Sequence, residues 1–93
     1  MREISAPLTE QVARAMKKRR VALDYKQSEA AARAGVTLST LQKFEQTGRI
    51  SLERFLKLCF AYRMDNQILN AVESRDFWTF EQIKRADAKK AVR

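Results

Sequence analysis

The fold is decided by residues 27–45, which read QSEAAARAGVTLSTLQKFE. Small alanines between positions 30 and 34 let two helices approach closely at a steep angle. Gly35 permits the backbone to reverse between them without a Cβ penalty. Thr37 is a good N-cap for the helix that follows, because its side chain can accept a hydrogen bond from a first-turn N–H. The stretch therefore predicts two short helices joined by a tight turn.

The flanking sequence predicts further helices, since the chain has only two glycines and one proline and shows no strand-like alternation. The expected fold class is all-α: a compact five-helix domain over residues 8–73 and a short helical C-terminal extension over residues 74–93. Residues Thr79 and Gln82 form a capping box that opens the last helix. Within the domain we expect a long helix from about Leu8 to Leu23, a helix capped by Ser51 and a fifth helix capped by Asp65.

Apolar residues recur at helical spacing on either side of the central stretch. Cys59 belongs to such a stripe, so we interpret it as a core residue. The stripe of the first helix comprises Val12, Ala15, Met16 and Leu23, and that of the fourth comprises Leu52, Phe55, Leu56, Cys59 and Tyr62.

Composition limits the function. The formal net charge of +8 favours a polyanionic partner, nucleic acid first and an anionic membrane surface second. A single cysteine and no histidine leave no intramolecular disulfide, no usual zinc site and no Ser-His or Cys-His catalytic pair. No apolar stretch has transmembrane length and no signal-peptide core is visible. We expect a soluble cytoplasmic protein of one domain, with no membrane contact, metal, cofactor or enzymatic activity.

The pattern Q-x-x-x-A-x-x-A-G-V-T-x-x-T-L-x-x-F-E, which starts at Gln27, resembles the helix-turn-helix of the Xre family. This is the lambda-repressor-like, Cro/C1-type fold of phage repressors and many bacterial regulators. The resemblance covers roughly residues 10 to 72 and includes the order and spacing of the helices. One departure is Ala30, where the family usually carries leucine.

The resemblance implies a role for each matching residue. Arg20 and Glu45 match a family ion pair between the first and third helices. An exposed lysine is by default solvated, and Leu38 is as well suited to packing against a protein, so these alternatives stay open. The base-reading positions are Leu38, Ser39, Gln42 and Lys43, and the phosphate-contacting positions are Lys26, Gln27, Thr37 and Arg49.

Three aromatic residues, Phe77, Trp78 and Phe80, follow the expected end of the domain. Such side chains need burial, so they either fold back on their own core or form a contact with a second copy or a partner. The basic tail from Lys84 to Arg93 is either a solvated helix end or an additional DNA contact.

These features favour a sequence-specific DNA-binding transcriptional regulator. We expect an autorepressor that binds a double-stranded DNA operator as a homodimer. The chain is also similar in size and layout to HipB-type antitoxins, which implies a HipA-like kinase toxin as a possible partner. The alternative function is a protein-interaction module that uses the same fold without specific DNA binding.

Overall fold

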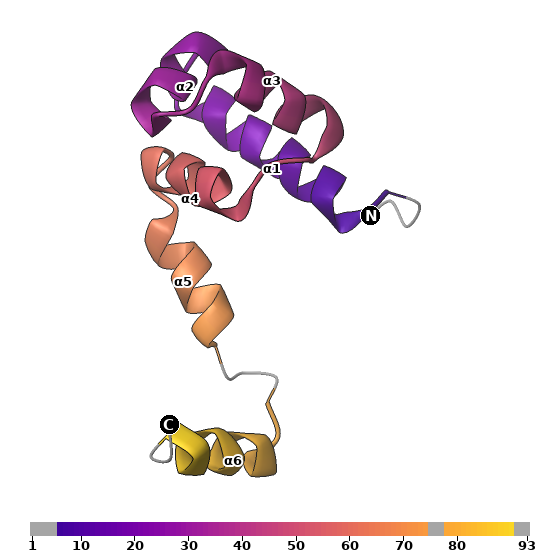
Figure 1. The fold of residues 1–93 in the computed structure, drawn as a ribbon, viewed down its shortest axis with the longest axis vertical. Helices are drawn as coiled ribbons and strands as arrows, with labels where there is room; N and C mark the ends of the chain where they lie inside the picture. The colour runs from indigo at the N-terminus through magenta and orange to yellow at the C-terminus, as the bar shows by residue number, and fades with distance from the viewer. Residues whose placement is uncertain (1–5, 75–77, 91–93) are drawn as a thin grey trace.

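The computed structural model describes residues 6–74 and 78–90, and every regular element in these ranges is an α-helix (Figure 1). The predicted all-helical class is confirmed. The described chain holds six helices rather than five, because the C-terminal extension contributes one to the total. The helices are α1 (Leu8–Ala22), α2 (Gln27–Ala34), α3 (Leu38–Thr47), α4 (Leu52–Ala61), α5 (Asp65–Glu73) and α6 (Phe80–Lys90).

The helix ends follow the capping chemistry of the sequence. Gly35 ends α2 in the left-handed region, with φ of 73°. Thr37 then caps α3, since its hydroxyl oxygen accepts a hydrogen bond of 3.0 Å from the Thr40 N–H. The predicted capping box of α6 is present: the Thr79 N–H donates to Gln82 Oε1 at 2.8 Å, and the Gln82 N–H donates to Thr79 Oγ1 at 3.2 Å.

Gly48 fixes how closely α1 and α3 approach. Its φ of 78° lies in the left-handed region, and it ends α3. A Cβ at this position would lie 2.8 Å from the backbone carbon of Thr9, at the start of α1. Glycine is therefore required twice at this position, once for the backbone turn and once for the contact between the two helices.

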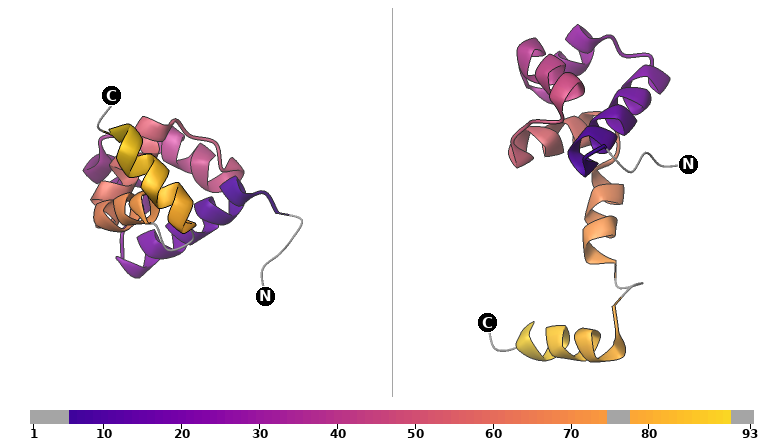
Figure 2. Two further views of the ribbon diagram at one scale, coloured as in Figure 1. Left: turned by 90° about the horizontal axis from the view of Figure 1, so that it is seen from below. Right: turned by 90° about the vertical axis from the view of Figure 1, so that its right-hand side faces the viewer.

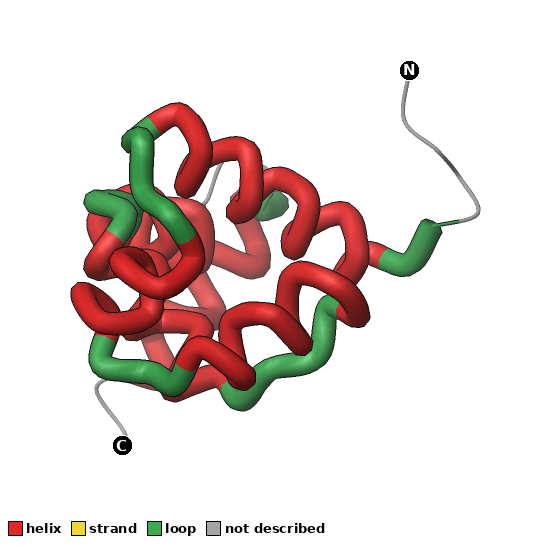
Figure 3. Tube along the Cα trace, turned by 90° about the horizontal axis from the view of Figure 1, so that it is seen from above, coloured by secondary structure: helices red, strands yellow, loops and turns green. Residues whose placement is uncertain are grey.

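One core lies between α1, α2, α3 and α4, which are joined by short loops (Figure 3). α5 adds the partly buried Ile68 to its edge but has no buried residue of its own. In the described residues no helix is long and apolar enough to cross a membrane. The apolar core consists of Ala13, Met16, Ala30, Ala31, Ala34, Leu41, Phe44, Leu58, Cys59 and Tyr62.

Three details of the predicted helices are wrong. Ala15 is exposed, because the buried face of α1 runs through Ala13, Met16 and Arg20. The predicted stripe of α4 divides: Cys59 and Tyr62 are buried, whereas Leu52 and Leu56 face solvent. Asp65 is the first residue of α5 and makes no capping hydrogen bond, since Met64 holds the N-cap position.

α5 and α6 extend away from the other helices. α5 continues from the end of α4 and points away from α1, α2 and α3 (Figure 1). α6 lies apart from α1–α4 in Figure 1 and in the right-hand view of Figure 2. The C-terminal third of the chain is therefore an arm on a compact four-helix body.

Tyr62 is the largest fully buried side chain, and its hydroxyl has no hydrogen-bond partner among the described residues. Its ring packs at a tilt against Tyr25, with 6.4 Å between ring centroids. Burial raises the pKa of Tyr62 to about 12; the charge of Glu45 adds to this shift and that of Arg20 opposes it.

We expect Tyr62→Phe to leave the free energy of unfolding at pH 7 unchanged or to raise it by about 1–2 kcal/mol, because a buried unsatisfied hydroxyl is removed. Above pH 10 the unfolded wild type ionises Tyr62 while the folded state keeps it neutral. The wild type should therefore lose about 2–3 kcal/mol relative to the variant as the pH rises from 10 to 12. Urea unfolding across this range measures both effects. A variant destabilised at pH 7 would show that the hydroxyl has a partner.

Candidate nucleic-acid interface

The candidate base-reading residues share the exposed side of α3. Leu38, Ser39, Gln42 and Lys43 are all exposed. Leu41 and Phe44, on the opposite side, are buried in the core. The second helix of the motif is thus held by its apolar side, which leaves the other side open to a ligand.

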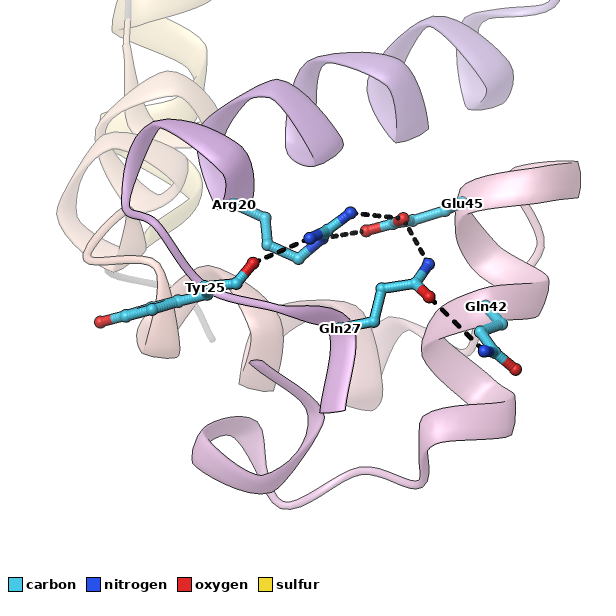
Figure 4. Close-up of polar contacts among 5 residues, drawn as sticks. All are labelled: Arg20, Tyr25, Gln27, Gln42 and Glu45. Carbon is cyan, nitrogen blue, oxygen red and sulfur yellow. Dashed lines mark hydrogen bonds and ion pairs between the residues drawn. The ribbon is translucent and has the colours of Figure 1, made fainter. Parts of the chain in front are cut away.

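A buried ion pair joins α1 to α3 (Figure 4). Arg20 Nε donates to Glu45 Oε2 at 2.7 Å, and Arg20 Nη2 donates to Glu45 Oε1 at 3.1 Å. The third donor, Nη1, bonds the Tyr25 carbonyl at 2.8 Å, in the loop between α1 and α2. The side chains of Arg20 and Glu45 are only 9% and 4% exposed. This pair is the one that the family resemblance implies.

The hydrogen bonds to Glu45 decide the charge state of Arg20. They raise the pKa of the guanidinium further above its usual range, although burial opposes the shift. Arg20 therefore stays charged, and the bidentate geometry fixes the angle between the two helices.

Two glutamines extend this network to the exposed side of α3. Gln27, the first residue of α2, donates from Nε2 to Glu45 Oε1 at 2.9 Å. Its Oε1 accepts from Gln42 Nε2 at 3.4 Å (Figure 4). Gln27 is therefore half-buried and oriented from both sides. The sequence did not reveal this linking role, because the two glutamines are 15 positions apart.

The N-terminus of α2 lies at the same end of the site. Lys26 is its N-cap and is exposed, and no side chain caps the helix. The N–H groups of the first turn, together with the positive end of the helix dipole, suit a phosphate oxygen. Thr37, the other predicted backbone contact, uses its hydroxyl to hold Thr40, accepting from its N–H and donating to its Oγ1 at 2.8 Å.

A polar groove of about 300 Å³ borders α3 on the side of α4. It brings together Lys43, Arg49 and Arg54, three cations from α3, the following loop and the first turn of α4. Arg54 is held by the α4 cap: its N–H donates to Ser51 Oγ at 3.2 Å, and its Nη1 contacts the same atom at 3.4 Å. Arg54 was missed from the sequence, although its place three residues after a capping serine is the signal that could have found it.

The remaining predicted residues lie elsewhere. Trp78 and Phe80 sit on the α6 side of the molecule, 40% and 74% exposed, so they do not fold back into the core. Phe77 lies outside the described residues. No group of three His, Cys, Asp or Glu side chains in the described parts could hold a metal ion.

Comparison with known families gives one result. The profile of a family described as Helix-turn-helix matches residues 16–64. The match contains α2 and α3 entire, together with the ion pair and the polar groove. No curated protein and no solved structure matches the chain.

We expect Glu45→Ala to lower the free energy of unfolding by about 3–5 kcal/mol, because it leaves the charge of Arg20 buried without a partner. The double variant Arg20→Met/Glu45→Leu replaces both charges by apolar groups and should cost clearly less. Urea denaturation at pH 7 measures all three proteins. A single variant no less stable than the double variant would contradict the role given to the pair.

Proposed function

Because the chain belongs to the Cro/C1-type, lambda-repressor-like family of helix-turn-helix DNA-binding proteins, we propose that it is a transcriptional regulator that reads a specific operator with α3. One observation carries the proposal. The exposed side of α3 combines polar and apolar side chains and is held from behind by the core and by the Arg20–Glu45 pair. Such a helix suits a DNA major groove, which offers donors, acceptors and the thymine methyl group.

Each exposed side chain of α3 suits one kind of base contact. Lys43 can donate to the O6 and N7 acceptors of guanine, and Leu38 can pack against a thymine methyl group. Ser39 can bond several bases and discriminates least. The amide nitrogen of Gln42 faces Gln27, so we propose that its carbonyl oxygen faces the DNA.

Phosphate contacts on both sides would set the position of α3. Lys26, Gln27 and the open N-terminus of α2 suit one backbone position. Arg49 and Arg54, in the polar groove, suit a second. The formal charge of +8 supports long-range attraction of the chain to DNA.

The finer parts of the proposal concern regulation. We propose that the protein binds a two-fold operator as a homodimer, represses its own gene and acts in the cytoplasm. A HipB-type antitoxin that also binds a HipA-like kinase is a narrower version. It is supported by the exposed Trp78 and Phe80, which offer a contact surface away from α3. The proposal assigns no catalysis.

A second candidate is a protein-interaction module. The observation in its favour is Leu38, an apolar side chain 40% exposed at the start of α3. In such a module Leu38 would contact a protein groove, and DNA binding would show no sequence preference.

We expect Lys43→Ala to weaken binding to the cognate DNA by about 1–3 kcal/mol and to relax base preference at one position. The probe is a duplex selected by the wild type from a random pool, and the readout is fluorescence anisotropy. Lys18→Ala is the matched control, since it removes the same charge from the exposed face of α1, opposite Ala13 and Met16. Equal reductions for Lys43→Ala on selected and random DNA would remove Lys43 from the base-reading set.

Substitutions in the polar groove should behave differently. We expect Arg54→Ala and Arg49→Ala each to weaken selected and random DNA alike. Each should also reduce the slope of log affinity against log salt concentration by about 1, as removal of one phosphate-binding cation requires. Anisotropy titrations between about 50 and 200 mM salt measure the slope. A slope unchanged in Arg54→Ala, with Lys18→Ala as reference, would place Arg54 off the DNA.

A further inference from the structure

The arm formed by α5 and residues 78–90 exposes apolar side chains along its length. Leu69 and Val72 of α5 are 55% and 75% exposed, and Phe80 of α6 is 74% exposed. α6 has 11 residues and lies apart from α1–α4. A helix of this length is marginal in water unless its apolar side packs on something. The arm therefore has the properties of a segment that completes its packing on another surface.

The four-helix body has an apolar groove that could receive such a segment. It has a volume of about 320 Å³ and lies between the end of α2 and the middle of α4. Leu56 and Phe60 form its apolar side; they stand one helical turn apart on α4 and are 42% and 71% exposed. We call it the α2–α4 groove, lined by Arg33, Ala34, Glu53, Leu56, Lys57 and Phe60.

The α2–α4 groove is separate from the DNA interface. None of the candidate base-reading or phosphate-contacting residues lines it, and neither does Arg54. A segment docked there would leave the exposed side of α3 open.

We propose that the arm of one copy of this chain docks in the α2–α4 groove of a second copy, and that the second copy's arm docks in return. The inference rests on the proposed function, because it supplies the contact for the homodimer. The same chain carries both the exposed apolar helix and an apolar groove, so a two-fold dimer satisfies both surfaces twice.

The area available is sufficient for a stable dimer. A standard interface takes roughly 800 Å² from each partner, about a tenth of this chain's accessible surface of 7589 Å². An aromatic side chain removes about 150–250 Å² when it is fully buried. Phe60 and Phe80 of both copies therefore supply about a third of the requirement, and Leu56, Leu69 and Val72 add to it.

The charges at the two surfaces are compatible with docking. The groove is bordered by Glu53, whose side chain is 80% exposed, and by Lys57 and Arg33. α6 carries Lys84 and Arg85, with Glu81 in its first turn. Both surfaces thus carry both signs, so opposite charges can meet at the rim although each chain has a net charge of +8.

The test uses the full chain and multi-angle light scattering without DNA. We expect the wild type to be a dimer. Phe60→Glu and Phe80→Glu should each weaken dimerisation by roughly 100-fold or more, because each substitution removes a central aromatic side chain from both docking sites of the dimer. Mixing the two variants in equal amounts should restore dimers. The Phe60→Glu copy still has an intact arm and the Phe80→Glu copy an intact groove, so the mixed dimer keeps one complete docking site.

Each alternative gives a different result. An arm-to-arm dimer would leave Phe60→Glu dimeric, a groove-to-groove dimer would leave Phe80→Glu dimeric, and neither would be restored by mixing; these outcomes, or a monomeric wild type, overturn the proposal. Leu8→Glu, at an exposed leucine in a separate apolar groove beside Phe44, is the control and should stay dimeric. Circular dichroism checks that each variant folds.

Binding to DNA is read separately, so the two proposals fail separately. We expect monomeric Phe60→Glu to bind a single half-site of the selected DNA as well as the wild type does. Dimers without sequence preference would reject the DNA function and leave the docked arm, whereas specific binding by a chain that does not exchange its arm would reject only the docking.

Discussion

The structure depends on the buried pair between Arg20 and Glu45. Taking two charges out of water is costly, and the cost is offset here because Glu45 accepts two bonds from Arg20 and a third from Gln27, while Arg20 also bonds the Tyr25 carbonyl. Apolar packing alone would allow α3 to slide against α1. A bidentate pair has one favourable geometry, and the close approach at Gly48 leaves little room for another.

The pair also connects the core to the exposed side of α3. Gln27 bonds Glu45 on one side and Gln42 on the other, so a residue at the start of α2 and a residue on the exposed side of α3 are oriented by the same carboxylate. A side chain that is oriented before binding loses less conformational entropy on binding. The same network thus supports stability and recognition.

Much of the fold could be predicted from the sequence, because the signals are local. Gly35, Thr37 and the capping box at Thr79 act through residues three or four positions away, and all three are present in the structure. The side of α4 that faces the core could not be predicted, because this helix is apolar on more than one side and packing chose Leu58 over Leu56. The Gln27–Gln42 bond and the position of Arg54 depend on how separate helices meet, which one sequence does not reveal. The direction of α5 depends on contacts beyond its own residues.

The central claim is that α3 reads base sequence, and the most direct measurement is anisotropy of the full chain on labelled DNA from upstream of its own gene. Scrambled DNA of equal composition serves as the comparison, at two salt concentrations. The account predicts that the upstream DNA is preferred by roughly 10³-fold or more at physiological salt, as for specific operators. Equal affinity for both DNAs, falling together as salt rises, would contradict it and leave a basic surface without sequence recognition.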